Sequence, residues 1–501
     1  MSKVEQFSNR WGIILASLGM AIGAGNLWRF PRLAGQYGGS FILLWILFLF
    51  VWSIPLLLAE FSIGKKFKRG VIGSFGLLVG EKLTWMGFFI TICTLGIAFY
   101  YSVVTAWSLE YLWLSLTTFY QEVVADVTLS DRLIADEDFL NNQWASIANQ
   151  NIGTVIVYLV VVIFGVFVVS KGIKSGLEKA NKILIPSLFI LLVIVAVAAL
   201  SMDNGVKGLE YMFVVDWNSF SNPTIWIEAL SQSAWSTGAG WGLMMTISSY
   251  AREKEDVTLN TFIGAFGNNT ASILSGMAIL PAVFALSASE GEALSFLQSG
   301  SQALTFTIIP RLFAEIPGGG IMTIIFFLAL SIAAFSSFLP MLELFRSNLA
   351  VLSSNKKIIA SLTIIVFIAF GFPSAYSLDF FSNQDWVWGL GLIISGIFIA
   401  IGTAVYGPVK FKKELIDQDS DFTIANAYFK YSIYAVIVMG GFIVYWWLSQ
   451  GNSQYTWFNE EGAWNVFDVY SNASVMTQWS LVILVGIAIN KILFKKFCSE
   501  T

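Results

Sequence analysis

Long apolar runs alternate with shorter polar segments along the whole chain. Each run is about 20 residues long, enough to cross a bilayer as one helix. The runs are centred near residues 22, 52, 100, 161, 190, 238, 272, 333, 363, 397, 438 and 484. The pattern predicts an all-α polytopic membrane protein with about twelve transmembrane helices.

The first apolar run contains residues that a membrane helix normally avoids. Residues 19–31 hold three glycines together with Asn26, Arg29 and Pro31. Glycine weakens a helix, and proline removes a backbone donor. Because hydrocarbon does not tolerate unpaired backbone polar groups, an irregular backbone at this depth has to face protein or a water-filled cavity. We therefore expect a helix that is unwound at its centre, with free carbonyls and amides that bind a ligand.

Close helix packing is the alternative interpretation, since Gly19 and Gly23 form a GxxxG pair. A second interruption changes the balance between the two. Residues 236–242 read Ser-Thr-Gly-Ala-Gly-Trp-Gly and lie midway through the sixth apolar run. Two glycine-broken helices in corresponding positions of two halves are the sequence pointer to the central site of a secondary transporter.

The positions of the two breaks suggest how the chain is organised. We expect a first repeat of five helices in residues 1–215, a second repeat in residues 216–410, and two additional helices in residues 411–501. Two outer polar segments are longer than the others: 119–151, which we expect to be polar loop with some helix, and 288–318. The second is rich in glycine and proline, which suits a loop that folds back toward the centre.

Composition supports the membrane assignment and removes several kinds of chemistry. Of the 501 residues, 56% are hydrophobic and only 12% are charged. The absence of histidine removes imidazole proton relays and the commonest metal ligand. Cys93 and Cys498 offer neither a disulfide framework nor a metal cluster. With no nucleophile–base set visible, we expect no enzyme. The partners we expect are a small molecule and the lipid bilayer, not nucleic acid.

Charged residues separate the loops into two kinds. Basic residues follow every second span, near residues 65–69, 171–182, 252–254, 356–357, 410–413 and 491–496. The loops after the third and eleventh spans are acidic. The positive-inside rule then places both termini in the cytoplasm of a multi-pass protein of the cell membrane.

Ionisable residues within the spans are functional candidates. Arg29 follows the first break and Asp385 opens the tenth span, so the two could close over a cavity from outside. Interfacial anchoring of each is the alternative. Glu60 and Glu228 lie deeper, and Glu60 could simply bond the backbone around a break.

Four motifs occur in an order that resembles the neurotransmitter:sodium symporter family over nearly the whole chain. They are Gly-Ala-Gly-Asn-Leu-Trp-Arg-Phe-Pro at 23–31, Gln-Ser-Ala-Trp-Ser at 232–236, Asn-Asn-Thr-Ala-Ser at 268–272, and Ala-Ala-Phe-Ser-Ser at 333–337. The resemblance implies a LeuT-type 5+5 inverted repeat with two extra C-terminal helices, in which the first and sixth helices are unwound. It also implies sodium-coupled symport of an amino acid by alternating access.

The resemblance carries a set of binding residues with it. One sodium site would use Ala21, Asn26, Ser236 and Asn268 together with the substrate carboxylate. A second sodium site would use Gly19, Ile22, Ala333, Ser336 and Ser337. The substrate would contact Ala21, Ala24, Gly25, Ile97, Tyr101, Trp235, Ser236, Gly238, Trp241, Ser337 and Met341. Trp235 and Tyr101 would form a lid below an Arg29–Asp385 outer gate, and Asp379 is the second choice for the acid of that gate.

Departures from the family's pattern bear on the substrate. Gly23 stands where monoamine carriers have an aspartate, so the substrate should bring its own carboxylate. Trp235 and Trp241 replace phenylalanines and remove volume, while Gly238 returns some. These features favour a small or medium neutral amino acid, and a large aromatic one stacked on the indoles is the alternative.

Chloride dependence is left open by the residues that would form the anion site. Gln232, Ser236 and Ser272 fit a chloride site. The family's tyrosine in the second helix is replaced by Trp45, which is bulkier. Glu228 lies one turn from Gln232 and could supply a negative charge instead of chloride.

The cytoplasmic gate also departs from the family. The arginine of its ion pair aligns with Val4 and the acid falls near Val351, so the pair is missing from the sequence. Lys3, Glu5 and Phe7 are the nearby substitutes.

Two rival functions follow from the same residues. A proton-driven transporter of the same fold would use Glu60 or Glu228 as the proton carrier. A non-transporting sensor would bind an amino acid without concentrating it. We expect a monomer or a weak homodimer.

Overall fold

The computed structural model describes residues 5–136, 138–316, 318–450 and 456–498. Within these ranges the chain is helical and forms no β-sheet; one isolated bridge joins Phe458 to Trp464. Nine helical segments in the described part of the chain are long and apolar enough to cross a membrane. Every span centre predicted from the sequence falls in a helix or in one of the two breaks, which confirms the all-α polytopic fold.

The helices of the first half are α1 (Arg10–Ala21), α2 (Ala24–Phe48), α3 (Ile54–Phe67), α4 (Val71–Val79), α5 (Thr84–Ala125), α6 (Leu129–Ala135), α7 (Phe139–Ala148), α8 (Ile152–Ser170) and α9 (Lys179–Leu200). Those of the second half are α10 (Gly205–Phe213), α11 (Pro223–Thr237), α12 (Leu243–Ser248), α13 (Val257–Leu286), α14 (Glu290–Gln298), α15 (Ser301–Ala303), α16 (Ile309–Ala314), α17 (Gly319–Leu352), α18 (Lys356–Tyr376) and α19 (Leu378–Tyr406). The chain closes with α20 (Pro408–Phe411), α21 (Asn426–Ser449), α22 (Asn472–Ala488) and α23 (Asn490–Phe497).

Side-chain caps fix where several of these helices begin. Asn9 accepts a hydrogen bond from the backbone N–H of Gly12 at 2.9 Å at the start of α1. Asp256 does the same for Leu259 at 2.7 Å at the start of α13. Such caps satisfy amides that have no partner inside the helix, and so they set the ends of the elements that frame the site.

The first break lies between α1 and α2. Ile22 (φ −82°, ψ 99°) and Gly23 (φ −122°, ψ −171°) both have extended backbones, so the helix stops at Ala21 and restarts at Ala24. The chain is then kinked inside α2 at Gly38, whose φ of +58° lies in the left-handed region that glycine adopts readily. This kink lies between the centres of the first and second predicted spans.

The second break lies between α11 and α12. Gly238, Gly240 and Gly242 have φ values of +70°, +94° and +74°, all in the left-handed region. A residue with a side chain rarely adopts this conformation. The three glycines therefore place the interruption where the sequence predicts it.

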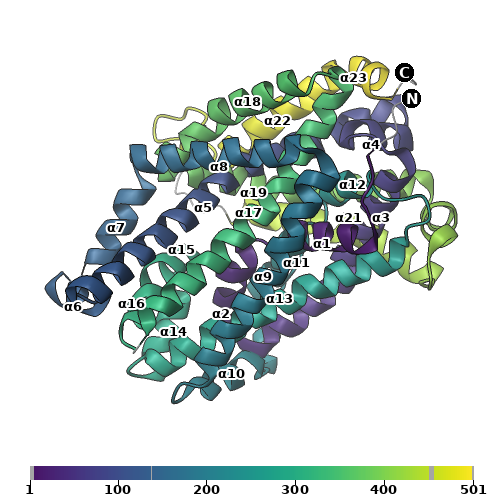
Figure 1. Ribbon diagram of the computed structural model, residues 1–501. Helices are drawn as coiled ribbons and strands as arrows, with labels where there is room; N and C mark the ends of the chain where they lie inside the picture. The colour runs from purple at the N-terminus through teal and green to yellow at the C-terminus, as the bar shows by residue number, and fades with distance from the viewer. Residues whose placement is uncertain (1–4, 137, 317, 451–455, 499–501) are drawn as a thin grey trace.

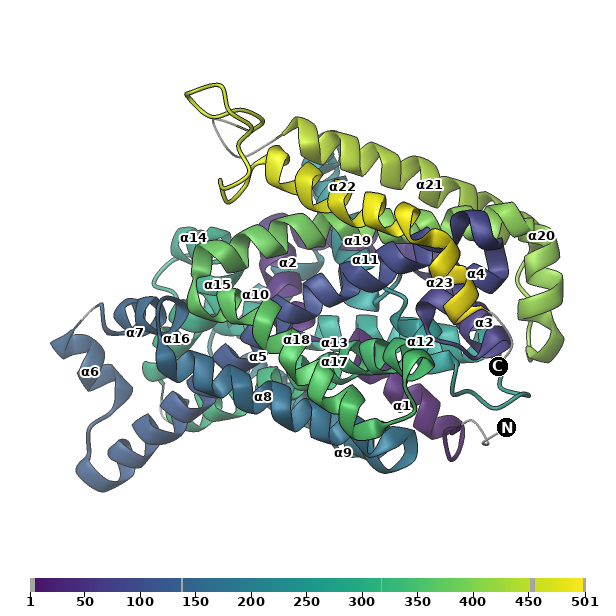
Figure 2. The ribbon, with the colours of Figure 1, turned by 90° about the horizontal axis from the view of Figure 1, so that it is seen from above.

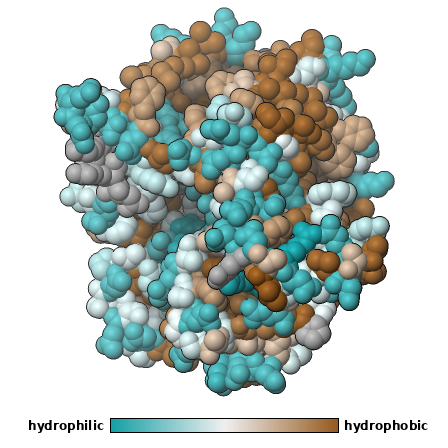
Figure 3. Space-filling model, turned by 90° about the vertical axis from the view of Figure 1, so that its left-hand side faces the viewer, coloured by the Kyte–Doolittle hydropathy of each residue, from teal (hydrophilic) through white to brown (hydrophobic). Residues whose placement is uncertain are grey.

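Both chain termini lie at one end of the bundle, and α6 and α7 lie at the other (Figures 1 and 2). Basic residues gather near the termini, where Lys65 bonds Asp419 at 2.8 Å and Arg10 bonds Glu255 at 3.2 Å. The opposite end is largely hydrophilic and has a recess near its middle (Figure 3). The two breaks lie between these ends.

Candidate binding site at the two helix breaks

A cavity of about 370 Å³ lies between the two breaks. Its walls include ten of the eleven residues predicted to contact a substrate, namely Ala21, Ala24, Gly25, Tyr101, Trp235, Ser236, Gly238, Trp241, Ser337 and Met341. The eleventh, Ile97, is fully buried and does not line the cavity. The structure therefore brings together residues that are separated by more than 300 positions in the sequence.

The start of α2 presents backbone amides to this cavity. The N–H of Ala24 donates to the hydroxyl of Tyr101 at 2.9 Å, and the N–H of Gly23 donates to Oδ1 of Asn26 at 2.9 Å. A Cβ placed on Gly25 would meet nothing within 4 Å, so the chain there borders open space. The positive end of a helix beside an open space suits a carboxylate.

Acceptor oxygens face one another beside the first break. Oδ1 of Asn268 accepts from Nδ2 of Asn26 at 2.8 Å, and the same atom lies 2.8 Å from the carbonyl oxygen of Ser236 and 3.2 Å from that of Ala21. Rotating the Asn268 amide would give the two carbonyls a donor but would set the nitrogens of both asparagines against each other. A cation shared by these oxygens satisfies all of them.

A second cluster of oxygens lies where α1 meets α17. The Oγ of Ser337 is 3.0 Å from the carbonyl oxygens of both Gly19 and Ile22. The Oγ of Ser336 is 3.0 Å from the carbonyl oxygen of Ala333 and 3.4 Å from that of Ile22. A hydroxyl has one proton to donate, so these carbonyls outnumber the available donors. Neutral oxygens in excess of donors are what a hard cation such as Na⁺ binds.

The predicted anion-binding residues present unpaired donors. In the described ranges, Nε1 of Trp45 and both polar atoms of the Gln232 side chain are buried without a hydrogen-bond partner. The hydroxyl of Ser272 accepts from Asn26 at 2.8 Å, which leaves its own proton for another acceptor. The hydroxyl of Ser236 has a different partner, because it accepts a hydrogen bond from Nδ2 of Asn268 at 3.2 Å.

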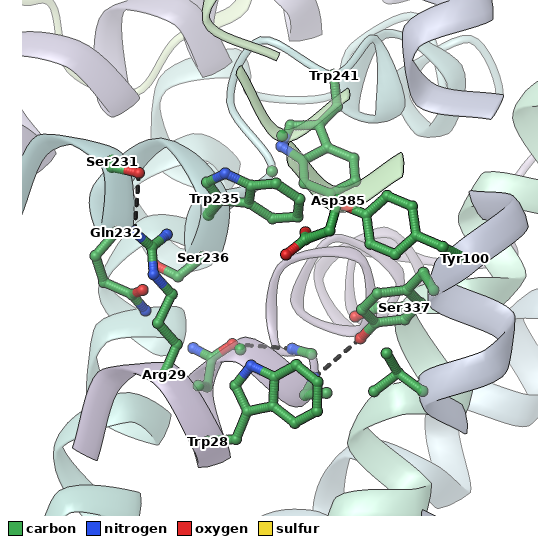
Figure 4. Close-up of a pocket in the computed structure, with 18 of the residues that line it drawn as sticks. Trp28, Arg29, Tyr100, Ser231, Gln232, Trp235, Ser236, Trp241, Ser337 and Asp385 are labelled. Atoms are coloured by element: carbon green, nitrogen blue, oxygen red, sulfur yellow. Dashed lines mark hydrogen bonds between the residues drawn. The ribbon is translucent and has the colours of Figure 1, made fainter. Parts of the chain in front are cut away.

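The expected outer pair between Arg29 and Asp385 is not formed in this structure. Nη2 of Arg29 bonds Oε2 of Glu228 at 2.8 Å and the hydroxyl of Ser231 at 3.0 Å. Figure 4 shows Arg29 turned toward Ser231, with Asp385 on the other side of Trp235 and beside Tyr100. Glu228 therefore takes the partner that the sequence assigned to Asp385.

The other acidic residues of the spans have different surroundings. Asp379 is exposed in the first turn of α19 and does not line the cavity. Glu60 is fully buried, and its two oxygens accept backbone N–H bonds from Gly240 at 2.6 Å and Met245 at 3.4 Å. The Glu60 carboxylate thus ties α3 to the second break.

Aromatic residues that the sequence did not single out form much of the cavity wall. They include Tyr100, Phe381, Trp386, Trp447 and Tyr470. The ring of Trp386 lies 5.3 Å from that of Trp447 and 5.7 Å from that of Tyr470. The Tyr100–Tyr101 pair was a visible signal, whereas nothing in the sequence connects Trp447 or Tyr470 with a site near residue 25.

The end that holds the termini is closed by several contacts. Phe7 is buried, and its N–H donates to the carbonyl oxygen of Tyr250 at 3.1 Å. The hydroxyl of Tyr250 donates to Glu343 at 2.5 Å, and Glu343 also pairs with Arg346 at 2.6 Å. Glu5 accepts from the N–H of Lys174 at 3.2 Å. Lys3 and Val4 lie outside the described residues.

Comparison with known proteins agrees with this geometry. The profile of the Sodium:neurotransmitter symporter family matches residues 4–500. A sodium-dependent transporter of Methanocaldococcus jannaschii is 31% identical over 430 residues, which cover 82% of this chain and 84% of the relative. A sodium-dependent neutral amino acid transporter of Mus musculus, B(0)AT2, is 28% identical over 300 residues, or 53% of this chain and 39% of the relative.

A solved structure shares the fold. The crystal structure of MhsT in complex with L-phenylalanine matches with a TM-score of 0.74 and 27% sequence identity. The match covers 88% of this chain and 98% of MhsT.

Proposed function

The chain belongs to the Sodium:neurotransmitter symporter family, whose members are transporters rather than enzymes, and on that premise we propose that it carries a neutral amino acid into the cell with two sodium ions. Membership of this family makes the protein a sodium-dependent multi-pass transporter. We infer the substrate and the number of sodium ions from the cavity and the two oxygen clusters.

One observation carries the proposal. Carbonyl and side-chain oxygens converge at both clusters without enough donors, while the start of α2 borders open space at Gly25 in the same cavity. Cations at the clusters would satisfy the oxygens, and the substrate carboxylate would lie at the positive end of α2. An amino acid fits this arrangement because its carboxylate can also serve as a ligand of the ion near Asn26.

Transport in this scheme proceeds by alternating access. Sodium binds first and draws the broken ends of α1 and α11 into one arrangement, because the ions bind that arrangement better than any other. The amino acid then enters below Trp235. The outer gate closes when Arg29 leaves Glu228 for Asp385, and the end near the termini, which we assign to the cytoplasm, opens afterwards.

We also propose that chloride binds beside the first sodium site. The unpaired donors of Trp45 and Gln232 and the free proton of Ser272 support this, since an anion is the acceptor that they lack. The carboxylate of Glu228 is already balanced by Arg29, which makes it a poor substitute for the anion.

The test uses the full-length protein in sealed liposomes. We expect an inward sodium gradient to concentrate one group among a panel of labelled neutral amino acids, with faster uptake in chloride than in gluconate. Ser337→Ala should raise the sodium concentration for half-maximal uptake at least about tenfold. Ser331→Ala is the matched control, because Ser331 is another buried serine of α17 outside the cluster, and it should behave as wild type.

Other outcomes identify the rival functions. Uptake that follows a proton gradient without sodium would assign the coupling to an acidic residue such as Glu60. Saturable binding without concentrative uptake would make the protein a sensor. Equal effects of Ser337→Ala and Ser331→Ala would remove the second oxygen cluster from sodium binding.

A further inference from the structure

The hydroxyl of Thr94 has a different kind of partner from several other hydroxyls of α5. Those of Thr91, Thr105 and Ser108 donate to carbonyls of α5 itself, four residues earlier. This is the usual arrangement for serine and threonine inside a helix. Thr94 is fully buried and instead donates to the carbonyl oxygen of Trp241 at 2.5 Å. Its hydroxyl therefore joins α5 to the second break.

The carbonyl that Thr94 binds lies in the second break, where helical partners are lost. Trp241 belongs to the glycine-rich segment 238–242. In a continuous helix its carbonyl would accept from the N–H of Met245, four residues later, but that N–H donates to Glu60 at 3.4 Å. A carbonyl without a donor is unfavourable away from water. The Thr94 hydroxyl supplies the donor that the break removes.

Two further contacts hold the backbone next to Trp241. Glu60 of α3 accepts from the N–H of Gly240 at 2.6 Å. A Cβ placed on Gly240 would lie 3.0 Å from Cα of Gly396 in α19, so the two backbones pack closely there. The segment is thus held by α3, α5 and α19, and the bond from Thr94 is the one that reaches Trp241 itself.

The side chain of Trp241 forms one end of the cavity. It is 3% exposed, lines the cavity, and its ring centroid lies 5.2 Å from that of Trp235. Figure 4 shows the two indoles next to each other. Thr94, Ile97 and Tyr101 follow one face of α5, and Tyr101 lines the cavity whereas Ile97 does not. The cavity thus reaches Tyr101 and ends at Trp241, before Ile97.

We propose that Thr94 is a positioning residue for the choice of amino acid. Its hydroxyl holds Trp241 in place as the end wall of the cavity, and this wall limits the substrate to small side chains such as that of alanine. Thr94 contacts no substrate and acts through Trp241. The inference rests on the proposed amino acid symport and adds the size class of the substrate and the residue that maintains it.

The physical reason is the freedom of the unwound segment. Without the hydroxyl, the carbonyl of Trp241 loses its donor, and the glycines on both sides allow the backbone to rotate toward another partner. The indole then leaves its position, and a longer side chain gains room. Discrimination falls, because a wall excludes a larger substrate by steric repulsion.

The experiment compares two labelled probes, L-alanine and L-leucine, with full-length protein in sealed liposomes under an inward sodium gradient. In the wild type, kcat/KM for alanine should exceed that for leucine at least about tenfold. Thr94→Val keeps a β-branched side chain and removes the hydroxyl, and it should lower this ratio at least about tenfold, chiefly through KM. The sodium concentration for half-maximal uptake should stay within about twofold of wild type, because both oxygen clusters are unchanged.

Thr91→Val is the matched control. Thr91 is a buried threonine one turn earlier in α5, and its hydroxyl bonds the carbonyl of Gly87 in the same helix. This variant should keep the wild-type ratio. Thr94→Ser retains the donor and should restore the ratio that Thr94→Val loses.

A double-mutant cycle tests whether Thr94 acts through Trp241. Trp241→Phe makes the wall smaller and should itself lower the ratio. Adding Thr94→Val to Trp241→Phe should lower the ratio no further, because both changes act on the same wall. If Thr94→Val does not fold, Thr94→Ala makes the same comparison.

Three results would overturn the inference. The first is a wild type that takes up leucine as efficiently as alanine. The second is a loss of both uptakes by the same factor in Thr94→Val, which a purely structural role predicts. The third is independent, additive effects in the double variant. A failure of the proposed symport differs from all three, since the wild type would then take up no amino acid with sodium.

Discussion

Gly23 and Gly25 are separated by one residue but have opposite surroundings. A Cβ on Gly23 would lie 2.6 Å from the hydroxyl of Tyr101 and 2.9 Å from Oγ of Ser337. A Cβ on Gly25 would border open space. The first glycine is required by packing, whereas the second leaves room beside the amides that we assign to the substrate carboxylate.

This contrast predicts different outcomes for two alanine variants. Gly25→Ala should fold as wild type and weaken amino acid binding about tenfold, because the methyl group occupies the ligand's space. Gly23→Ala should also lower the free energy of unfolding by about 1–3 kcal/mol through overpacking against Tyr101. Equilibrium binding and denaturant titration in detergent measure the two effects. Wild-type binding by Gly25→Ala would show that the carboxylate lies elsewhere.

Single residues differ in how well the sequence predicts their surroundings. Asn26 and the pair Ser336–Ser337 stand out because polar groups in an apolar run need partners, and the structure gives them partners in the two clusters. The partner of Arg29 could not be predicted in the same way. Two carboxylates, those of Glu228 and Asp385, line the same cavity, and only the three-dimensional arrangement decides between them.

At the scale of elements, the second break depends on a carboxylate from another helix. Glu60 of α3 accepts N–H bonds from Gly240, in the middle of the glycine-rich segment, and from Met245, in the first turn of α12. These amides have lost their helical partners because the chain is unwound there. Glu60 replaces those partners, which favours a structural role over proton transfer.

Glu60→Gln tests that role. One acceptor oxygen becomes an NH₂ group that faces a backbone N–H, so we expect the free energy of unfolding to fall by about 1–3 kcal/mol. Glu414→Gln is the control. Glu414 is half-buried, and its carboxylate accepts a hydrogen bond from the hydroxyl of Tyr406 at 2.6 Å. If Glu60→Gln kept full stability and lost only proton-driven uptake, the proton-carrier alternative would gain support.

Helix breaks were easier to predict than helix ends. Three closely spaced glycines mark the second break in the sequence, and all three have positive φ in the structure. The exact end of α5 is harder to predict, because the sequence indicates polar loop with some helix in residues 119–151 without showing that α5 continues to Ala125. Hydropathy reports where a segment meets lipid, and a helix that leaves the membrane keeps its backbone hydrogen bonds without that signal.

At the scale of the whole molecule, one of the two additional C-terminal helices contributes to the cavity. Ile443 and Trp447 of α21 line it, and Trp447 packs on Trp386 of α19. Side chains far apart in the chain form this wall. Hydropathy alone carries no information about which helices meet.

The converging oxygens at the two breaks also have a thermal consequence. An ion that binds only the folded protein raises its stability by RT ln(1 + [L]/Kd), which is about 2.7 kcal/mol at a concentration one hundred times Kd. We expect the melting temperature to rise with sodium but not with choline at the same ionic strength, and to rise less in Ser337→Ala. Identical melting curves in both salts would count against cation binding at these oxygens. If sodium binds at these oxygens, the melting temperature measures how fully the sodium sites are occupied. The sodium-free protein then unfolds at the lowest temperature.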